Sequence, residues 1–177
     1  MSEVMKGIRI QKVVVNMGVG EAGEELKKAQ KIMEIITSEK PIQTKCKVKA
    51  PTWDIRPGLP IGLKVTLRKE KAKEFLNRAL SAKEKRIFAK SFDKEGNFGF
   101  GIKEYIDMPG AKYDPKLGIR GFDVLVCLSK PGHRIKDRKI RSRKIPLQHR
   151  VSKDEAINFV KESFGVEVEW ITMIKLM

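Results

Sequence analysis

Cysteine, histidine and long apolar runs are all scarce in this sequence, and each scarcity excludes a class of protein. Its 177 residues include two cysteines and two histidines. Cys46 and Cys127 cannot hold together a small secreted scaffold, and neither has a neighbour at metal-ligand spacing. The sequence therefore predicts a reducing compartment and no metal site.

The sequence also lacks the segments that direct a chain to a membrane. Glu3 and Lys6 stand where a secretory signal would have its apolar core, and the longest late apolar run, WITMIKLM, is too short to span a bilayer. The predicted helices carry charge of both signs, unlike the basic amphipathic helices that bind anionic lipid. We therefore expect a cytoplasmic protein with no membrane partner.

A glycine-rich motif near the N-terminus has the spacing of a dinucleotide-binding turn but lacks its context. In VVVNMGVGEAGEELKKAQ the glycines Gly18, Gly20 and Gly23 spell G-x-G-x-x-G, with Glu21, Glu24 and Glu25 among and after them. These carboxylates would repel a phosphate from the start of the following helix. Glu39 has the spacing of a ribose ligand, but it precedes the next strand instead of ending it. The motif thus predicts a tight exit from a strand and no cofactor.

Side chains suited to catalysis do not converge in the sequence. His133 and His149 both lie among arginines, without a serine, cysteine or carboxylate pattern that indicates a nucleophile or a metal site. The acids of EYIDMPG and KYDPK lie next to proline and glycine, which favour loops. We therefore predict that the protein is not an enzyme.

Positive charge is abundant and is confined to two segments. The chain carries a net charge of +16. Residues 40–73 hold ten Lys or Arg against two acids, residues 131–150 hold eight against one, and the rest of the chain is nearly neutral. Mixed charge is enough for solubility, whereas a segregated field of one sign is typical of a surface that meets an oppositely charged partner. The distribution favours a polyanion as the partner.

Hydrophobic periodicity predicts a single α+β domain over residues 1–177. Strand patterns occupy residues 8–15, 42–48, 61–68 and 122–129, and residues 91–101 have the pattern of a hairpin. Two helical stripes are Leu26, Ala29, Ile32, Met33, Ile36 and then Ala72, Phe75, Leu76, Ala79, Leu80, and a third helix follows the capping box of Ser152 and Glu155. This order predicts a mostly antiparallel sheet with helices on one face, the split βαβ arrangement of ferredoxin-like and RRM-like folds.

The helix-free face of this sheet is predicted to bind RNA. Its polar residues are Arg9, Gln11, Asn16 and Gly18 from the first strand, Gln43, Lys45 and Lys47 from the second, and Lys64, Thr66 and Arg68 from the third. Ile42, Thr44, Cys46 and Val48 are expected on the buried side. The polar positions contain no ring on which a base could stack, which favours structured RNA bound by its shape and backbone. The alternative is that they are ordinary solvent-facing positions.

Four motifs resemble a known family. VVVNMGVGEAG, IRPGLPIGLKVTLR, SFDKEGNFGFGIKEY and YDPKLGIRGFDVLV are similar, in that order, to signature stretches of the universal large-subunit ribosomal protein five. The similarity covers about residues 4–165. A further stretch, KPGHRIKDRKIRSRKIPLQHR, resembles the insertion of archaeal and eukaryotic members, which indicates an archaeal form.

The resemblance implies a structural protein of the large ribosomal subunit that binds 5S rRNA, anchors it in the central protuberance and contacts transfer RNA in the P site. 5S rRNA would bind the sheet and the loops at its edge, through the polar residues named above. The loop of residues 49–60 would face the transfer RNA with Lys49, Thr52, Trp53 and Arg56. Trp53 either stacks on an exposed nucleotide or packs on the prolines of its own loop.

Further partners are implied by the same resemblance. They are the large-subunit 23S-type rRNA, large-subunit protein eighteen, and small-subunit protein thirteen, with the loop of residues 107–118 as the bridge to the small-subunit head. The basic insertion, residues 131–150, has no bacterial counterpart, and extended basic segments commonly order on ribosomal RNA. Its cations are Arg134, Lys136, Arg138, Lys139, Arg141, Arg143 and Lys144. The rival functions are a free RNA chaperone or assembly module on the same fold and a nucleotide-dependent enzyme.

Overall fold

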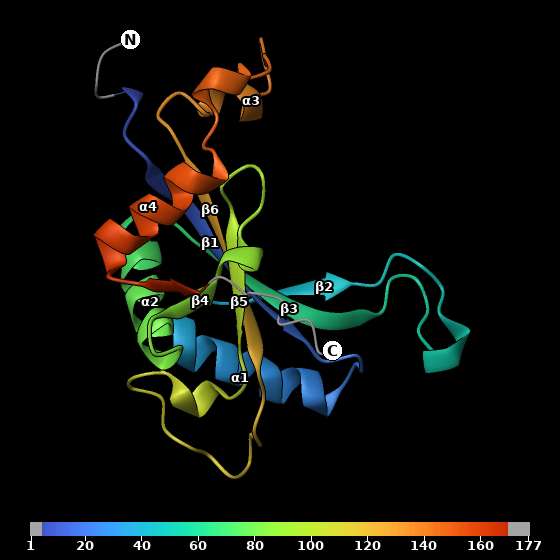
Figure 1. Cartoon of the computed structure of the whole chain (residues 1–177). Coiled ribbons are helices and arrows are strands. Elements are labelled where there is room, and N and C mark those ends of the chain that lie inside the picture. The colour runs from blue at the N-terminus through green and yellow to red at the C-terminus, as the bar shows by residue number, and fades with distance from the viewer. Residues whose placement is uncertain (1–4, 170–177) are drawn as a thin grey trace, which may run out of the picture.

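The computed structural model describes residues 5–169 and contains a five-stranded antiparallel sheet (Figure 1). The sheet has the order β2-β3-β1-β6-β5 and is built from β1 (Arg9–Gly18), β2 (Ile42–Lys45), β3 (Pro60–Leu67), β5 (Phe98–Ile102) and β6 (Phe122–Ser129). The helices are α1 (Glu24–Thr37), α2 (Lys69–Ala82), α4 (Lys153–Phe164) and the short α3 (Arg134–Asp137). A separate parallel pair joins β4 (Arg86–Phe88) to β7 (Glu167–Glu169).

The chain connections confirm the predicted α+β class and its split βαβ unit. Strands β1 and β2 are joined through α1, and β3 lies between them and pairs with both in the antiparallel sense. After α2 the chain returns to the other edge of β1, where β6 pairs with it, and β5 extends the sheet beyond β6. Strand β1 is therefore hydrogen-bonded along both edges and forms the centre of the sheet.

Alternation of apolar residues along the central strands explains why one face of the sheet is buried. Val13, Val15 and Met17 of β1 are at most 1% exposed, and Leu63 and Val65 of β3 pack in the same core. Successive side chains of a strand point to opposite faces, so the residues between them lie on the other side of the sheet. The buried side chains of β5, β6 and the helices join this single core.

Helices α1 and α2 cover the apolar face with the stripes that the sequence predicts. Each has apolar residues three and four positions apart, which places them on one side of the helix. All ten predicted stripe residues are buried: Leu26, Ala29, Ile32, Met33 and Ile36 in α1, and Ala72, Phe75, Leu76, Ala79 and Leu80 in α2. The helices thus leave the opposite face of the sheet uncovered.

Helix α4 begins at the predicted capping box. The Glu155 backbone N–H donates to the Ser152 hydroxyl oxygen at 3.3 Å, and the Ser152 backbone N–H donates to the Glu155 carboxylate at 3.1 Å. These two bonds satisfy donors that the first turn of a helix otherwise leaves without partners. The helix ends at Gly165, whose φ of 61° is the left-handed conformation that glycine adopts without a steric penalty.

Two segments differ from their predicted form. The predicted hairpin in residues 91–101 is limited to one isolated bridge between Phe92 and Phe98, because β5 pairs with β6 instead. Strand β2 ends at Lys45, three residues earlier than predicted, because the chain then leaves the sheet as a projecting loop (Figure 1). Within residues 5–169, no helix is both long enough and apolar enough to cross a membrane.

Removing the cap of α4 tests how much the box contributes to stability. We expect Ser152→Ala to lower the free energy of unfolding by about 1 kcal/mol, because one helix-end N–H loses its acceptor. Urea denaturation measures the change. Ser163→Ala, at an exposed position late in the same helix, is the matched control, and an equal loss in both variants would contradict a capping role for Ser152.

Candidate nucleic-acid interface

The helix-free side of the sheet, here called the open face, carries polar side chains from its three longest strands. Lys64 of β3 is paired with Asn16 of β1 on one side and with Ile42 of β2 on the other. Thr66 is paired with Val14. Residues paired across a ladder point to the same face, so Asn16, Lys64 and Thr66 share the open face as predicted.

A β-bulge brings Arg9 to this face. Ile10 pairs with the buried Leu128 and Lys12 with Cys127, so Gln11 is the extra residue of the bulge. Without the bulge Arg9 would have the same orientation as Val13 and would point into the core. With it, Arg9 lies opposite Ser129 and is exposed. Gln11 itself is held by the insertion, since its side-chain amide donates to the Asp137 carboxylate at 3.2 Å.

The predicted arrangement of β2 is wrong. Gln43 is paired with the core residue Leu63, so it lies on the side opposite to Lys64, whereas Ile42 and Thr44 face the open side. A register shift then brings Lys45 opposite Pro60, and Lys47 lies beyond the strand. The prediction failed because β2 is an edge strand whose register with β3 turns Ile42 away from the core. Ile42 is 64% exposed.

Two further residues complete the predicted set at the ends of the strands. Arg68 is exposed at the N-terminus of α2, directly after β3. Gly18 is exposed at the end of β1, and a Cβ built there would meet nothing within 4 Å. An approaching RNA backbone would therefore find open space at this position.

Sequence reasoning missed several residues of the open face. Lys12 lies on it and pairs with Cys127, while Asp123 and the 47%-exposed Leu125 contribute an acidic and an apolar position. Lys12 directly precedes the buried Val13, so a strict alternation counted back from Val13 would have found it. Across the described strands no aromatic ring lies on this face, which confirms that part of the prediction.

Strand β5 contributes two glycines to one end of the open face. Gly99 pairs with Leu125, and a Cβ at Gly99 would lie 2.7 Å from Leu125 Cδ2. Gly101 pairs with Asp123, and a Cβ there would lie 3.2 Å from a carboxylate oxygen. The Leu125 and Asp123 side chains thus occupy the space over both glycines.

The glycine turn after β1 lacks the geometry of a nucleotide site. The backbone N–H groups of Val19 and Gly20 both donate to the Ile61 carbonyl, at 3.0 and 2.9 Å, so they are not directed at a ligand. Glu25 in the first turn of α1 bonds to Lys28 and Arg120, and these contacts hold the pKa of its carboxyl below the ordinary value of 4.5. A carboxylate thus stands at the helix start where a phosphate would need to bind.

The loop between β2 and β3 projects far from the body of the protein (Figure 1). Its tip is closed by an antiparallel bridge between Ala50 and Ile55. Trp53 sits in a single 3-10 turn and is 74% exposed, so packing on the loop's own prolines covers little of its ring. The cations of the predicted tRNA-facing set, Lys49 and Arg56, are exposed on the same loop, as is Thr52.

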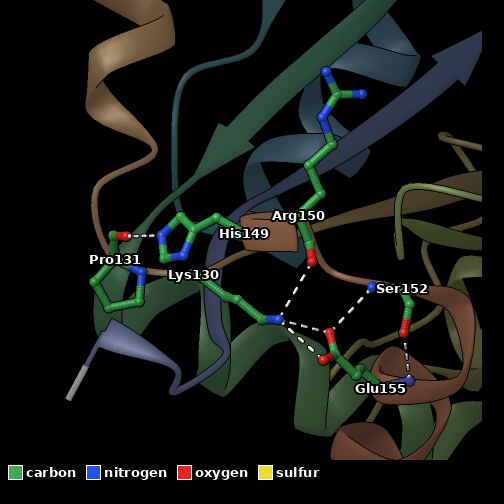
Figure 2. A network of polar contacts seen from close by, with 6 residues as sticks. All are labelled: Lys130, Pro131, His149, Arg150, Ser152 and Glu155. Atoms are coloured by element: carbon green, nitrogen blue, oxygen red, sulfur yellow. Dashed lines mark hydrogen bonds and ion pairs between the residues drawn. The ribbon is translucent and has the colours of Figure 1, made fainter. Parts of the chain in front are cut away.

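The basic insertion is tied together at its base. Figure 2 shows the Lys130 ammonium next to the Arg150 carbonyl, at 3.3 Å, and next to the Glu155 carboxylate, at 2.8 Å. His149 Nε2 lies 2.7 Å from the Pro131 carbonyl, to which it donates. These contacts join the two ends of the insertion to each other and to α4. Its seven predicted cations are all exposed: Arg134, Lys136, Arg138, Lys139, Arg141, Arg143 and Lys144.

Comparison with known proteins identifies the family. A family model described as ribosomal protein L5 matches residues 3–56, and a second model, described as the C-terminus of the same ribosomal family, matches residues 60–159. The chain belongs to the ribosomal protein L5 family. Both matched segments contribute to one sheet, because β1 from the first pairs with β3 and β6 from the second.

Several similar proteins within the ribosomal protein L5 family are archaeal. The large ribosomal subunit protein uL5 of Methanosphaera stadtmanae is 50% identical over 94% of this chain and 99% of the relative. The uL5 protein of Methanococcus aeolicus is 51% identical over 91% of this chain and 91% of its own length. That of Nanoarchaeum equitans is 48% identical over 95% of this chain and 99% of its own length.

Membership in the L5 family decides between the predicted functions. The chain is a structural protein of the large ribosomal subunit and not an enzyme, so the nucleotide-dependent alternative is excluded. It is located in the cytoplasmic ribosome, together with ribosomal RNA and other ribosomal proteins. The archaeal type inferred from the insertion is confirmed by the relatives.

The ion pair at the base of the insertion predicts a pH dependence of stability. The hydrogen bond from Lys130 holds the pKa of Glu155 below its ordinary value of 4.5. A carboxyl whose pKa is lowered by folding adds stability that is complete above the unfolded pKa and is lost as the pH falls through the folded pKa. We therefore expect Glu155→Gln to cost about 1 kcal/mol at pH 7, since half-exposed ion pairs are weak, and less below about pH 4.

Urea denaturation between pH 3 and pH 7 measures this dependence. Glu162→Gln, which changes an exposed glutamate of the same helix, is the control and should follow the unmodified protein throughout. A cost for Glu155→Gln that stays constant down to pH 3 would show that the carboxylate charge contributes nothing.

Proposed function

We propose that the open face binds 5S rRNA and thereby anchors it in the central protuberance of the large subunit. The observation that carries this proposal is the ring-free polar set of Lys12, Asn16, Lys64, Thr66 and Arg68, which are half-buried or exposed on the side of the sheet that no long helix covers. Ammonium, guanidinium, amide and hydroxyl donors suit phosphate oxygens and ribose hydroxyls, which are the same for every base.

The form of the face supports a folded RNA as its ligand. Proteins that hold flexible single strands stack the bases on aromatic side chains, and the described strands offer none on this face. The end of β1 at Gly18 instead provides an open region where a rigid double-helical backbone can approach closely. A free RNA chaperone on the same fold would need to bind unfolded RNA equally well.

The projecting loop is proposed to contact transfer RNA in the P site. Support comes from its reach beyond the sheet (Figure 1) and from the 74% exposure of Trp53 near its tip. The exposed indole has a large surface for stacking on a nucleotide. Lys49 and Arg56, on the same loop, can bind the adjoining phosphates. Because so little of the ring is buried, its packing within the loop contributes little to stability.

Other contacts in the ribosome are proposed from the family resemblance. We assign the 23S-type rRNA and protein eighteen as neighbours in the central protuberance, and protein thirteen of the small subunit as the partner of residues 107–118. That loop is held at its base, where the Asp114 backbone N–H donates to the Tyr105 hydroxyl at 3.2 Å. It exposes Tyr113, which is 54% accessible, and aromatic residues of this kind are enriched at protein interfaces.

Replacing two cations of the open face tests the 5S rRNA contact. We expect Lys64→Ala combined with Arg68→Ala to weaken binding of folded 5S rRNA and to reduce the slope of log affinity against log salt by about 1 for each phosphate that is no longer neutralised. Thermal stability should change little, because both side chains are exposed. Filter binding at several salt concentrations provides the measurement.

The matched control removes the same charge from the helical side. Lys31→Ala with Lys73→Ala changes two exposed cations of α1 and α2. If both double variants lose affinity equally, the protein attracts RNA through net charge alone and the open face is not the site. Equal affinity of the unmodified protein for unfolded RNA of the same length would show that the open face does not select folded RNA.

The role of Trp53 is tested separately. We expect Trp53→Ala to leave the free energy of unfolding within about 0.5 kcal/mol, because the ring is mostly exposed. The free energy of binding transfer RNA should weaken by that of one base stack, about 1–3 kcal/mol. Trp53→Phe should lose less affinity than Trp53→Ala, because a phenyl ring can still stack. Unchanged binding in Trp53→Ala together with a large loss of stability would instead place the ring in the packing of its own loop.

A further inference from the structure

A cavity of about 260 Å³ lies between the basic insertion and the end of the sheet. Its floor includes Lys12 and Cys127, which are paired with each other on the open face. Its walls include Lys136 and Lys144 from the insertion. The cavity therefore extends from the open face, and the basic insertion closes one side of it. The family resemblance assigned no partner to this insertion.

The insertion is held in place over the cavity by contacts at both of its sides. Gln11 of the β-bulge lies 3.2 Å from His133 Nδ1 and donates to Asp137 at the same distance, which fixes α3 to β1. At the other side, His149 bonds to the Pro131 carbonyl and the Lys130 side chain, 9% exposed, bonds to Glu155 (Figure 2). The cavity is thus shaped by the protein itself.

The cavity walls are positively charged, and some of their lysines form no ion pair. Its two acids already have partners, because Asp137 accepts from Gln11 and Glu95 pairs with Arg150 at 3.2 Å. Among residues 5–169, Lys12, Lys136 and Lys144 take part in no ion pair. Three lysines around one cavity create a positive field that attracts an anion.

We infer that this cavity binds a phosphate of an RNA backbone, so that the insertion grips the RNA lying on the open face. Lysine binds phosphate as a compact point charge, and three lysines remain for it while the one arginine of the cavity is engaged by Glu95. The inference rests on the proposed RNA-binding function and adds a second, separate contact to it.

The two histidines of the chain provide a selective probe, since both line this cavity. Their imidazole signals in a two-dimensional proton–carbon spectrum of the full chain report on its occupancy at constant pH. Titration with a uridine trinucleotide at low salt should shift both signals in a saturable way. We expect Lys136→Ala with Lys144→Ala to weaken this binding roughly tenfold, because charged hydrogen bonds to the phosphates are removed.

The matched control is Lys139→Ala with Arg143→Ala, which removes two cations of the same insertion that do not line the cavity. This variant should bind the trinucleotide almost as the unmodified protein does. Equal weakening in both double variants, or histidine signals that do not move, would overturn the inference.

Two further probes separate the sources of the anion. Inorganic pyrophosphate that shifts the signals while the trinucleotide does not would show a site for small phosphates and would overturn the assignment to RNA. A triglutamate peptide that binds in place of the trinucleotide would assign the cavity to an acidic protein segment instead. Failure of the 5S rRNA proposal would appear separately, as an unchanged 5S affinity in the Lys64 and Arg68 variant.

Discussion

The pairing of β1 on both of its edges is the constraint on which the rest of the structure depends. Because β3 and β6 bind it from either side, its orientation is fixed, and the side chains of Val13, Val15 and Met17 must enter the core. The residues between them must then lie on the opposite face. The core and the proposed RNA surface are therefore two consequences of one alternation, and a shift of β1 by one residue would exchange them.

The β-bulge at Gln11 changes this alternation where the insertion meets the sheet. It turns Arg9 to the open face, beside Lys12, and leaves Gln11 available to hold α3 through Asp137. The same end of the sheet therefore carries cations and the support for a basic segment. In this way a local irregularity of one strand connects the flat open face to the walls of the cavity under the insertion.

The sequence was informative for elements whose buried residues recur at a regular spacing. The stripes of α1 and α2, the limits of β6 and the capping box of α4 were all predicted. Burial of one face gives apolar residues a regular spacing, and a capping box requires particular residues three positions apart. It was misleading for β2, where Ile42 is exposed and the register with β3 decides the orientation. Three features depend on residues far apart in the chain, and no local pattern predicts them. They are the bulge, the pairing of β4 with β7, and the contact of Gln11 with the insertion.

The central claim is that RNA lies on the helix-free side of the sheet. Lysine acetylation of the free protein and of its complex with folded 5S rRNA, with each site measured by mass spectrometry, tests this claim most directly. The account predicts that 5S rRNA slows the modification of Lys12 and Lys64 and leaves Lys27 and Lys73, on the exposed sides of α1 and α2, unchanged. Protection of Lys27 and Lys73 with full reactivity of Lys12 and Lys64 would contradict it.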